Sequence, residues 1–286
     1  MRPYFDVHCH IGMTVSRAPV VGQSVGRCMA RMASAGVVGA VPCPTAGGPQ
    51  DRGVLNTRAQ NEVIARACQR YPERFPIGLG IVEVRHEQAG VDELDRAMNQ
   101  GRLVGFACHP ALSGHSLGAE LHAFLEVVAM GDGLCLLHQA GSTRNIATYS
   151  RRFPEITFII GHVSMNKAGH YDAIEHCGSC ENVWFDVAQK PNGADTSWDM
   201  AHLVNALGSE RVMFGSDLPY YDFRLVQAQI ESANIDENTK DKIAYQNAVR
   251  LVQTFRPNWT LTTEPISPPQ IYTEEEIWAA KGARLV

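Results

Sequence analysis

Residues 4–10 read Tyr-Phe-Asp-Val-His-Cys-His, a short β-rich apolar run that ends in two histidines two positions apart. Side chains alternate between the two faces of a strand, so His8 and His10 are expected on the same side. Three later apolar runs also end in residues that bind metals, namely Leu136-Leu-His138, Ile159-Ile-Gly-His162 and Phe214-Gly-Ser-Asp217. This recurrence is typical of parallel strands whose carboxyl ends meet at one place.

The rest of the chain alternates short apolar runs with longer amphipathic ones. Strands are predicted at 4–8, 37–42, 75–82, 103–108, 134–138, 157–161, 183–186 and 212–215. Helices are predicted near 24–34, 58–72, 90–99, 118–130, 144–152, 166–177, 197–207 and 239–254. Nearly continuous apolar strands indicate a parallel sheet that is covered on both faces. Eight strand–helix repeats predict an α/β fold, a (β/α)8 TIM barrel of the metal-dependent hydrolase type, over residues 1–255.

The last residues, 256–286, fall outside this pattern and are rich in proline and threonine. We expect this C-terminal extension to pack on the barrel or on a neighbouring subunit.

Composition excludes several classes of partner. The chain has 286 residues, a net charge of −5 and no basic block, so we expect no nucleic acid and no membrane partner. No apolar run reaches the roughly 18–20 residues of a membrane span, and no signal peptide is apparent at the N-terminus. Eight cysteines scattered through apolar segments indicate reduced thiols and a cytoplasmic protein. The expected partner is a small-molecule substrate, and a homodimer is the default assembly.

Five polar side chains are predicted to converge on the carboxyl-terminal rim of the barrel, where barrel enzymes place their active sites. His138 follows Leu134 and Leu136 with inward spacing. By the same reasoning His162 follows Phe158 and Ile160, and Asp217 follows Met213 and Gly215. Imidazole and carboxylate groups bind catalytic divalent ions, which lower the pKa of a bound water toward neutrality. The pattern therefore predicts metal-dependent chemistry.

These motifs resemble the amidohydrolase superfamily, in particular the amidohydrolase-related branch that includes aminocarboxymuconate-semialdehyde decarboxylase. The resemblance covers residues 4–254 and rests on Asp6-Val-His-Cys-His10, Tyr71-Pro-Glu-Arg-Phe75, Val104-Gly-Phe-Ala-Cys-His-Pro110, Ile160-Gly-His162, Asn182-Val-Trp-Phe-Asp186, Arg211-Val-Met-Phe-Gly-Ser-Asp217-Leu-Pro219 and Asn247-Ala-Val-Arg-Leu251. It implies that His8, His10, His138 and Asp217 bind the metal. It also implies that His162 is catalytic, either bonded to the metal-bound water or polarising the substrate. A carboxylate beside the metal can accept a proton and return it, so Asp217 is a catalytic candidate as well.

The sequence departs from the family at one position. Ala107 stands where relatives with two metal ions often have a lysine that bridges them, so we expect one divalent ion. Zinc is the default for three histidines and an aspartate, with manganese, nickel or iron as alternatives.

Further side chains are candidates for the same rim. His109, Asp186, Trp184, Arg17 and Tyr220 are predicted substrate contacts. For Trp184 the alternative is to fill the barrel, and for Asp186 it is a hydrogen bond to His162. Asp6 shares the spacing of His8 and His10, so it either orients a ligand or makes a structural hydrogen bond deeper in the barrel. An arginine near the mouth, such as Arg17 or Arg144, suits a carboxylate substrate.

Three functions remain open at this stage. The first is a metal-dependent hydrolase of a small amide, ester or lactone, in which a metal-activated water attacks the carbonyl. The second is a non-oxidative decarboxylase of an aromatic or unsaturated carboxylic acid, which an arginine converging on the metal would favour. The third is a barrel that binds a ligand without turnover, against which the intact set of five residues argues.

Overall fold

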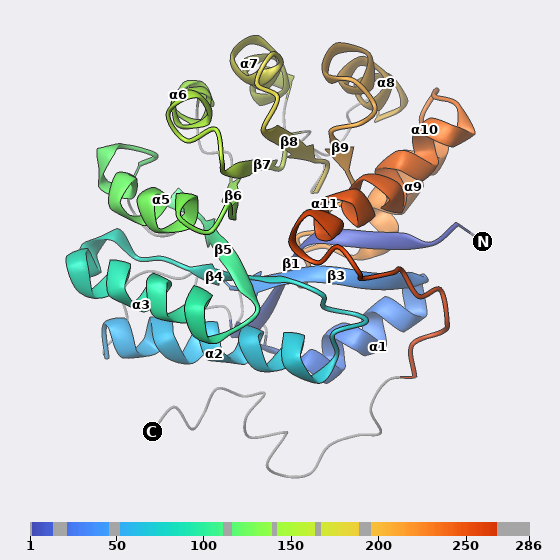
Figure 1. Ribbon diagram of the computed structural model, residues 1–286. Helices are drawn as coiled ribbons and strands as arrows, with labels where there is room; N and C mark the ends of the chain where they lie inside the picture. The colour runs from blue at the N-terminus through green and yellow to red at the C-terminus, as the bar shows by residue number, and fades with distance from the viewer. Residues whose placement is uncertain are drawn as a thin grey trace.

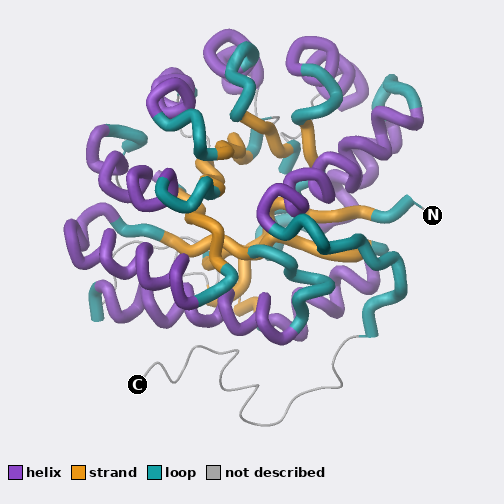
Figure 2. The backbone as a smooth tube through the Cα atoms, viewed as in Figure 1, coloured by secondary structure: helices purple, strands orange, loops and turns teal. Residues whose placement is uncertain are grey.

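Eight parallel strands follow one another in chain order around a common axis, and the helices lie outside them (Figures 1 and 2). The structure is a computed structural model that describes residues 2–13, 22–45, 52–110, 116–138, 142–163, 167–188 and 196–267. The parallel strands are β1 (Tyr4–Met13), β3 (Val37–Pro44), β4 (Gly78–Ile81), β5 (Leu103–Cys108), β6 (Leu134–His138), β7 (Thr157–Gly161), β8 (Val183–Asp186) and β9 (Val212–Met213). All eight lie where the apolar runs predict them.

The strand ladders form two sheets, ordered β2-β1-β3 and β4-β5-β6-β7-β8-β9, and further backbone hydrogen bonds link them at both seams. At one seam the Val7 amide donates to the Phe214 carbonyl at 3.0 Å. At the other, the Ala40 amide donates to the carbonyl of Arg74, just before β4, at 2.8 Å. The short strand β2 (Gly22–Gln23) pairs antiparallel with the end of β1. The arrangement is that of a (β/α)8 barrel, as predicted.

The helices are α1 (Val25–Ala35), α2 (Val54–Arg70), α3 (Glu87–Gln100), α5 (His122–Ala129), α6 (Arg144–Arg152), α7 (Lys167–Cys177), α8 (Thr196–Leu207), α9 (Phe223–Ser232), α10 (Glu237–Asp241) and α11 (Asn247–Phe255), with 3₁₀ turns at Val84–His86 and Ala119–Leu121. The sequence prediction missed α9. The helix predicted at 239–254 is present as a continuous helical run over 237–255, in which a π-helical turn at Lys242–Gln246 lies between α10 and α11.

Several helix ends follow directly from local sequence. Ser24 precedes α1 and its side chain accepts a hydrogen bond from the Arg27 amide, while Gly36 ends the helix with φ +67°. Asp222 caps α9 in the same way as Ser24 caps α1. Such caps satisfy amides that have no partner within the helix, and a left-handed C-terminal residue suits glycine.

The hydrophobic core has an inner and an outer part. We call the inner part the interior cluster. It draws on α11 and on the parallel strands other than β8, and its main members are Phe5, Val7, Val41, Ile77, Leu79, Leu134, Leu136, Ile159, Met213, Ala248, Leu251 and Val252. The outer part joins the other faces of the strands to the surrounding helices. The last three members of the interior cluster belong to α11, so this helix closes the amino-terminal end of the barrel.

An irregularity in β1 reverses the side-chain alternation between Asp6 and Cys9. Phe5 and Val7 belong to the interior cluster, whereas Cys9 and Ile11 pack in the outer core. The pairing of β1 with β3 shifts register between Asp6 and Cys9, which changes the face that each residue presents. His8 and His10 therefore face inward as predicted, but Asp6 does not share their spacing in the way the sequence suggested.

The described part of the extension, residues 256–267, lies against the barrel. Trp259 packs its ring against Phe5 at a centroid distance of 5.5 Å. The Arg74 guanidinium donates to the carbonyls of Val38 and Glu264 at 3.0 and 2.7 Å. In the part of the chain that the structure describes, none of the helices has the length and apolarity that crossing a membrane requires.

Candidate metal centre

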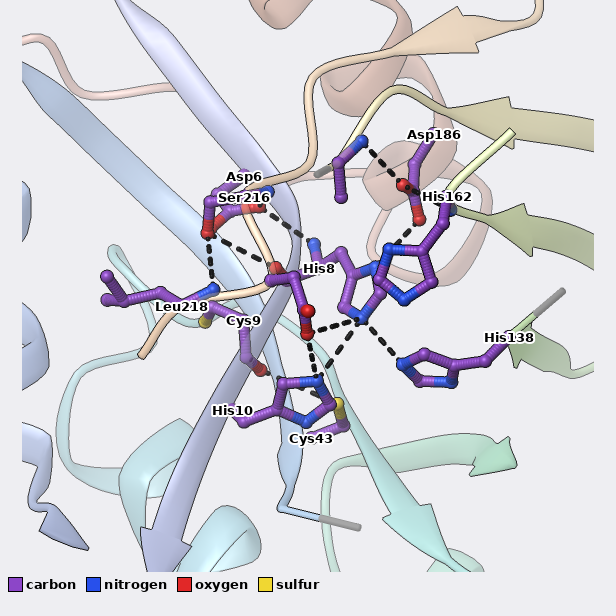
Figure 3. Close-up of polar contacts among 12 residues, drawn as sticks. Asp6, His8, Cys9, His10, Cys43, His138, His162, Asp186, Ser216 and Leu218 are labelled. Atoms are coloured by element: carbon purple, nitrogen blue, oxygen red, sulfur yellow. Dashed lines mark hydrogen bonds and ion pairs between the residues drawn. The ribbon is translucent and has the colours of Figure 1, made fainter. Parts of the chain in front are cut away.

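Four side chains, two from β1, one from β6 and one from the segment after β9, point their donor atoms at one place. Figure 3 shows the three histidines of this set turned toward one another. His8 Nε2 lies 3.2 Å from His10 Nε2 and 2.8 Å from His138 Nε2. Asp217 Oδ1 lies 2.8 Å from His10 Nε2 and 3.5 Å from His8 Nε2. All four side chains are at most 2% exposed. The structure thus brings together the four side chains that the sequence predicts as metal ligands.

Each of the three histidines is anchored through its other ring nitrogen. His10 Nδ1 lies 2.9 Å from the Pro44 carbonyl and His138 Nδ1 lies 2.9 Å from the Cys108 carbonyl. His8 Nδ1 lies 2.8 Å from a carboxylate oxygen of Asp186. Carbonyl and carboxylate oxygens only accept hydrogen bonds, so Nδ1 carries the proton in each ring and Nε2 presents a lone pair.

This donor set fits a divalent cation. Three Nε2 lone pairs and a carboxylate oxygen, all buried and directed at one point, repel one another unless a positive charge lies between them. Burial alone would lower the pKa of His10, but Cys43 and Asp217 raise it, so His10 attracts a proton when no cation is present. A cation would displace that proton, as metal binding to histidine generally does.

His162 reaches the same place by a route that the sequence did not predict. Phe158 and Ile160 lie in the outer core and Ile159 in the interior cluster, so the predicted inward spacing of β7 was wrong. His162 instead has φ +65°, a left-handed backbone that turns its side chain into the barrel immediately after the strand. Its ring centroid lies 4.8 Å from that of His8 and 5.0 Å from that of His138.

The burial and hydrogen bonding of the His162 ring suit a contact with a bound ligand. The residue is 2% exposed, and neither ring nitrogen has a hydrogen-bond partner in the described part of the chain. Burial lowers the pKa of His162 to about 4, so the ring is neutral at pH 7. Buried ring nitrogens without partners are unusual in folded proteins, which is consistent with a group that contacts a bound molecule.

Asp217 also has a left-handed backbone, with φ +60°. Hydrogen bonds to the preceding residue, Ser216, hold this segment in place. Asp6 accepts hydrogen bonds from the Ser216 amide at 3.0 Å and the Ser216 hydroxyl at 2.6 Å. The Asp217 amide donates to the His8 carbonyl at 2.8 Å. Asp6 therefore orients the ligand-bearing segment through the backbone, and burial raises the pKa of its carboxyl to about 7.

Asp186 connects the metal ligands to His162. Besides accepting from His8 through Oδ2, it accepts from the His162 amide at 3.1 Å and from the Ala188 amide at 2.9 Å through Oδ1. Burial alone would raise its pKa, but the charge of His8 and the hydrogen bond to it lower the pKa below its usual range. The carboxylate is fully buried and fully engaged, so we propose an orienting role for Asp186 in place of the predicted substrate contact.

Two other predicted substrate contacts lie beside the donor set. The His109 ring stacks on His138 at a centroid distance of 4.0 Å, and burial lowers its pKa to about 3. The Tyr220 ring lies 6.0 Å from that of His10, edge to face. Both remain proposed substrate contacts.

Two of the remaining candidates, Trp184 and Arg144, lie away from the donor set. Trp184 packs against the interior cluster, with the Arg250 guanidinium 4.9 Å from its ring centroid, so it fills the barrel and is no longer proposed as a substrate contact. Arg144 begins α6 and is exposed. Arg17 lies outside the described residues.

Sequence reasoning did not identify the anchors of the three histidines or the bracing role of Ser216. The sequence does contain one indication of the tight packing at these positions: a glycine lies one residue before His162 and another lies two residues before Asp217. A Cβ atom on Gly161 would lie 3.3 Å from His8 Cε1, and one on Gly215 would lie 3.0 Å from Asp186 Cγ. Both positions must be small for the inner side chains to fit.

Comparison with known proteins supports this description. A 5-carboxyvanillate decarboxylase from Sphingomonas paucimobilis matches with a TM-score of 0.64 and 17% identity, over 88% of this chain and 99% of that one. A dihydroxybenzoic acid decarboxylase from a Polaromonas species, solved with manganese and 2-nitroresorcinol, matches with a TM-score of 0.66 and 15% identity, over 88% and 97% of the two chains. A probable 2-pyrone-4,6-dicarboxylic acid hydrolase from Acinetobacter baumannii matches with a TM-score of 0.63 and 17% identity, over 87% and 98%.

No curated protein sequence matches the chain. The family model described as "Amidohydrolase", however, matches residues 5–253, nearly the whole barrel. With its fold, its buried histidine–aspartate donor set and this match, the chain belongs to the amidohydrolase family of metal-dependent enzymes.

Proposed function

We propose that the protein is a metal-dependent, non-oxidative decarboxylase of an aromatic or unsaturated carboxylic acid. The observation that carries this choice is that decarboxylases of 5-carboxyvanillate and of dihydroxybenzoic acids are among the similar solved structures and match over nearly their full lengths. This reverses the order in which the sequence alone ranked decarboxylase and hydrolase.

The chemistry suits the residues at the site. Decarboxylation breaks the bond between the carboxyl carbon and its neighbour, releases CO2, and leaves an electron pair on the neighbouring carbon that must accept a proton. A divalent ion held by His8, His10, His138 and Asp217 would supply positive charge to anchor the anionic oxygens of the substrate.

His162 is the proposed proton carrier. Its ring nitrogens have no partner among the described residues, and its centroid lies within 5.0 Å of two ligand rings. An anionic substrate beside it favours the protonated imidazole, which can then deliver the proton to carbon. His109 and Tyr220 would position the ring of the substrate from the sides.

We propose one divalent ion, with zinc expected from three imidazoles and one carboxylate. Manganese is the first alternative, since the Polaromonas enzyme was solved with it. Metal analysis of wild type and His138→Ala checks this: about one equivalent is expected in wild type, with a clear loss in the variant.

The test of the reaction is CO2 release from a panel of hydroxybenzoic and methoxy-hydroxybenzoic acids by the metal-loaded protein. The His162→Asn variant should retain its metal and lose turnover by about 10²–10⁴-fold, the usual contribution of a proton-transfer group. If no acid in the panel releases CO2 while lactones or amides are cleaved, the decarboxylase proposal is wrong.

A hydrolase of a small ester, amide or lactone is the second candidate. A probable 2-pyrone-4,6-dicarboxylic acid hydrolase is also among the similar solved structures, and this observation favours the hydrolase. Asp217 would then accept the proton of the attacking water.

We also propose a homodimer in the cytoplasm, with residues 1–255 as the barrel domain and 256–286 as an extension. Light scattering on the purified protein tests the assembly.

A further inference from the structure

A second pocket, of about 330 Å³, lies at the end of the barrel opposite the metal centre. Its walls include Arg102, Arg256, Phe255, Trp259, Pro72 and Pro76. Arg102 immediately precedes β5, and Phe255 ends α11, the helix that closes the amino-terminal end of the barrel. No step of the proposed reaction uses this pocket.

Among the residues that the structure describes, the walls of this pocket include two arginines and no carboxylate. Arg102 and Arg256 are both half-buried, and neither forms an ion pair in the described part of the chain. Arg256 donates a hydrogen bond to the carbonyl of Phe255 at 3.0 Å. Burial and the nearby charge of Arg102 lower the pKa of Arg256, and the other titratable neighbour is Cys68. Burial raises the pKa of the Cys68 thiol to about 12, so it is neutral.

Helix termini offset part of this charge but not all of it. Arg102 follows the last turn of α3, and Arg256 is the C-terminal cap of α11. The end of a helix carries a partial negative charge of about half an electron. These partial charges are smaller than the two full positive charges, so the arginine pair still attracts an anion.

The other walls define the shape of the ligand. Phe255, Trp259, Pro72 and Pro76 present flat or rigid apolar surfaces. The Trp259 indole Nε1 is buried and has no acceptor among the described residues. A volume of 330 Å³ is near the lower end for small-molecule sites.

We propose that this pocket binds a small organic carboxylate with a flat apolar body. The two guanidinium groups take the carboxylate, as arginine forks commonly do. The aromatic and proline walls contact the apolar body. The site is separate from the metal centre, so the bound molecule is not being turned over there.

Calorimetric titration of the metal-loaded protein with benzoate tests the proposal, with benzamide as the neutral ligand of the same shape. Benzoate can also bind at the metal, so wild type should show two binding events and the Arg102→Gln/Arg256→Gln variant one. Each single variant should weaken the second event at least tenfold, and benzamide should give none at this site. The Arg66→Gln variant, whose arginine side chain is 66% exposed on α2, is the control and should match wild type.

Three results would overturn the proposal. The first is an identical titration in wild type and in the double variant, provided that both melt at similar temperatures. The second is binding of inorganic phosphate at this site without binding of benzoate, which would make it a phosphate site. The third concerns the acidic run Glu274-Glu275-Glu276, which lies outside the described residues. If replacing all three by glutamine raises benzoate affinity more than tenfold, this run is the natural occupant.

Discussion

The three ligating histidines differ in what holds their outer nitrogen. Backbone carbonyls of Pro44 and Cys108 anchor His10 and His138, so no side-chain substitution can remove those anchors directly. The anchor of His8 is the Asp186 carboxylate, which also accepts the amide of His162. A single residue therefore links a metal ligand to the proposed proton carrier.

We predict that Asp186→Asn weakens metal binding by about 10–100-fold, the usual effect of losing the partner of a ligating histidine. The amide keeps the size of the carboxylate but loses its charge, and it offers a donor where two backbone amides already donate. Competition with a chromogenic chelator measures the affinity. Asp95→Asn, which changes an exposed carboxylate on α3, is the matched control. Equal affinity in the two variants would mean that His8 keeps its orientation without Asp186.

At the residue scale the sequence indicated which side chains meet but not how each reaches the centre. The ligand types and their order along the chain are visible because each ends an apolar run. The inward turn of His162 was not visible, because it depends on one left-handed backbone angle and not on strand alternation. The anchoring of His8 by Asp186 joins two distant strands, and short-range pattern carries no information on such a contact.

At the element scale, strands were easier to predict than helices. Buried parallel strands are continuous apolar runs, so their positions follow closely from composition. Helix α9 was missed because the irregular segment after β9, which carries Asp217, hides where the next element begins. The π-helical turn between α10 and α11 has a good helical sequence on both sides, and only the packing of the whole domain reveals it.

Two glycines provide a matched test of backbone constraint. Gly105 in β5 has φ +149°, and a Cβ atom there would lie 1.9 Å from the Leu134 carbonyl oxygen. Gly208 has φ +82° with nothing within 4 Å of its Cβ position. We predict that Gly105→Ala lowers the free energy of unfolding by at least about 3 kcal/mol, because the strand pair must separate. Gly208→Ala should cost only about 1–2 kcal/mol of backbone strain. Urea denaturation of both variants measures the difference, and similar losses would contradict the steric argument.

Glu93 of α3 joins two helices and a strand. It accepts hydrogen bonds from Arg58 at 2.9 Å, from Arg96 at 2.7 and 2.8 Å and from Asn61 at 3.2 Å. Asn61 in turn accepts the Ile81 amide of β4. We predict that Glu93→Gln lowers the free energy of unfolding by about 1.5–3 kcal/mol, the range for hydrogen bonds to a charged group. Glu62→Gln, at a 43% exposed side chain, should change it by less than about 0.5 kcal/mol.

Wild type and Glu93→Gln should also differ in how their stability depends on pH. Burial alone would raise the pKa of Glu93, but hydrogen bonds from Arg96, Arg58 and Asn61 outweigh this and lower it below 4.5. Because the folded pKa is lower than the unfolded one, the stabilisation is fully present above the unfolded pKa and is lost as pH falls through the folded pKa. The stability difference between wild type and Glu93→Gln should therefore be constant near neutral pH and shrink in acid below about 4.5. A difference that grows in acid would contradict the assignment.

At the scale of the whole molecule, the two ends of the barrel have separate tasks. The carboxyl-terminal end holds the metal donors, while α11 and residues 256–267 cover the amino-terminal end (Figure 1). Arg74, which is 7% exposed, connects this extension to β3 through its bonds to Val38 and Glu264.

We predict that Arg74→Met releases the extension without affecting the metal site. Hydrogen exchange in residues 256–267 should speed up by at least tenfold, and metal content should stay unchanged. The free energy of unfolding should fall by about 1–3 kcal/mol, since the buried carbonyls lose a charged donor. Arg66→Met, at an exposed arginine, should leave exchange in this segment as in wild type. Unchanged protection in Arg74→Met would mean that Trp259 and its neighbours hold the extension alone.

The left-handed backbones of His162 and Asp217 have a consequence for laboratory evolution. Each costs the fold about 1–2 kcal/mol relative to a residue that adopts this conformation freely. A library selected only for heat resistance would therefore favour glycine or asparagine at positions 162 and 217, and the fittest clones would be inactive. Selection for turnover has to act on the same population for an improved catalyst to survive.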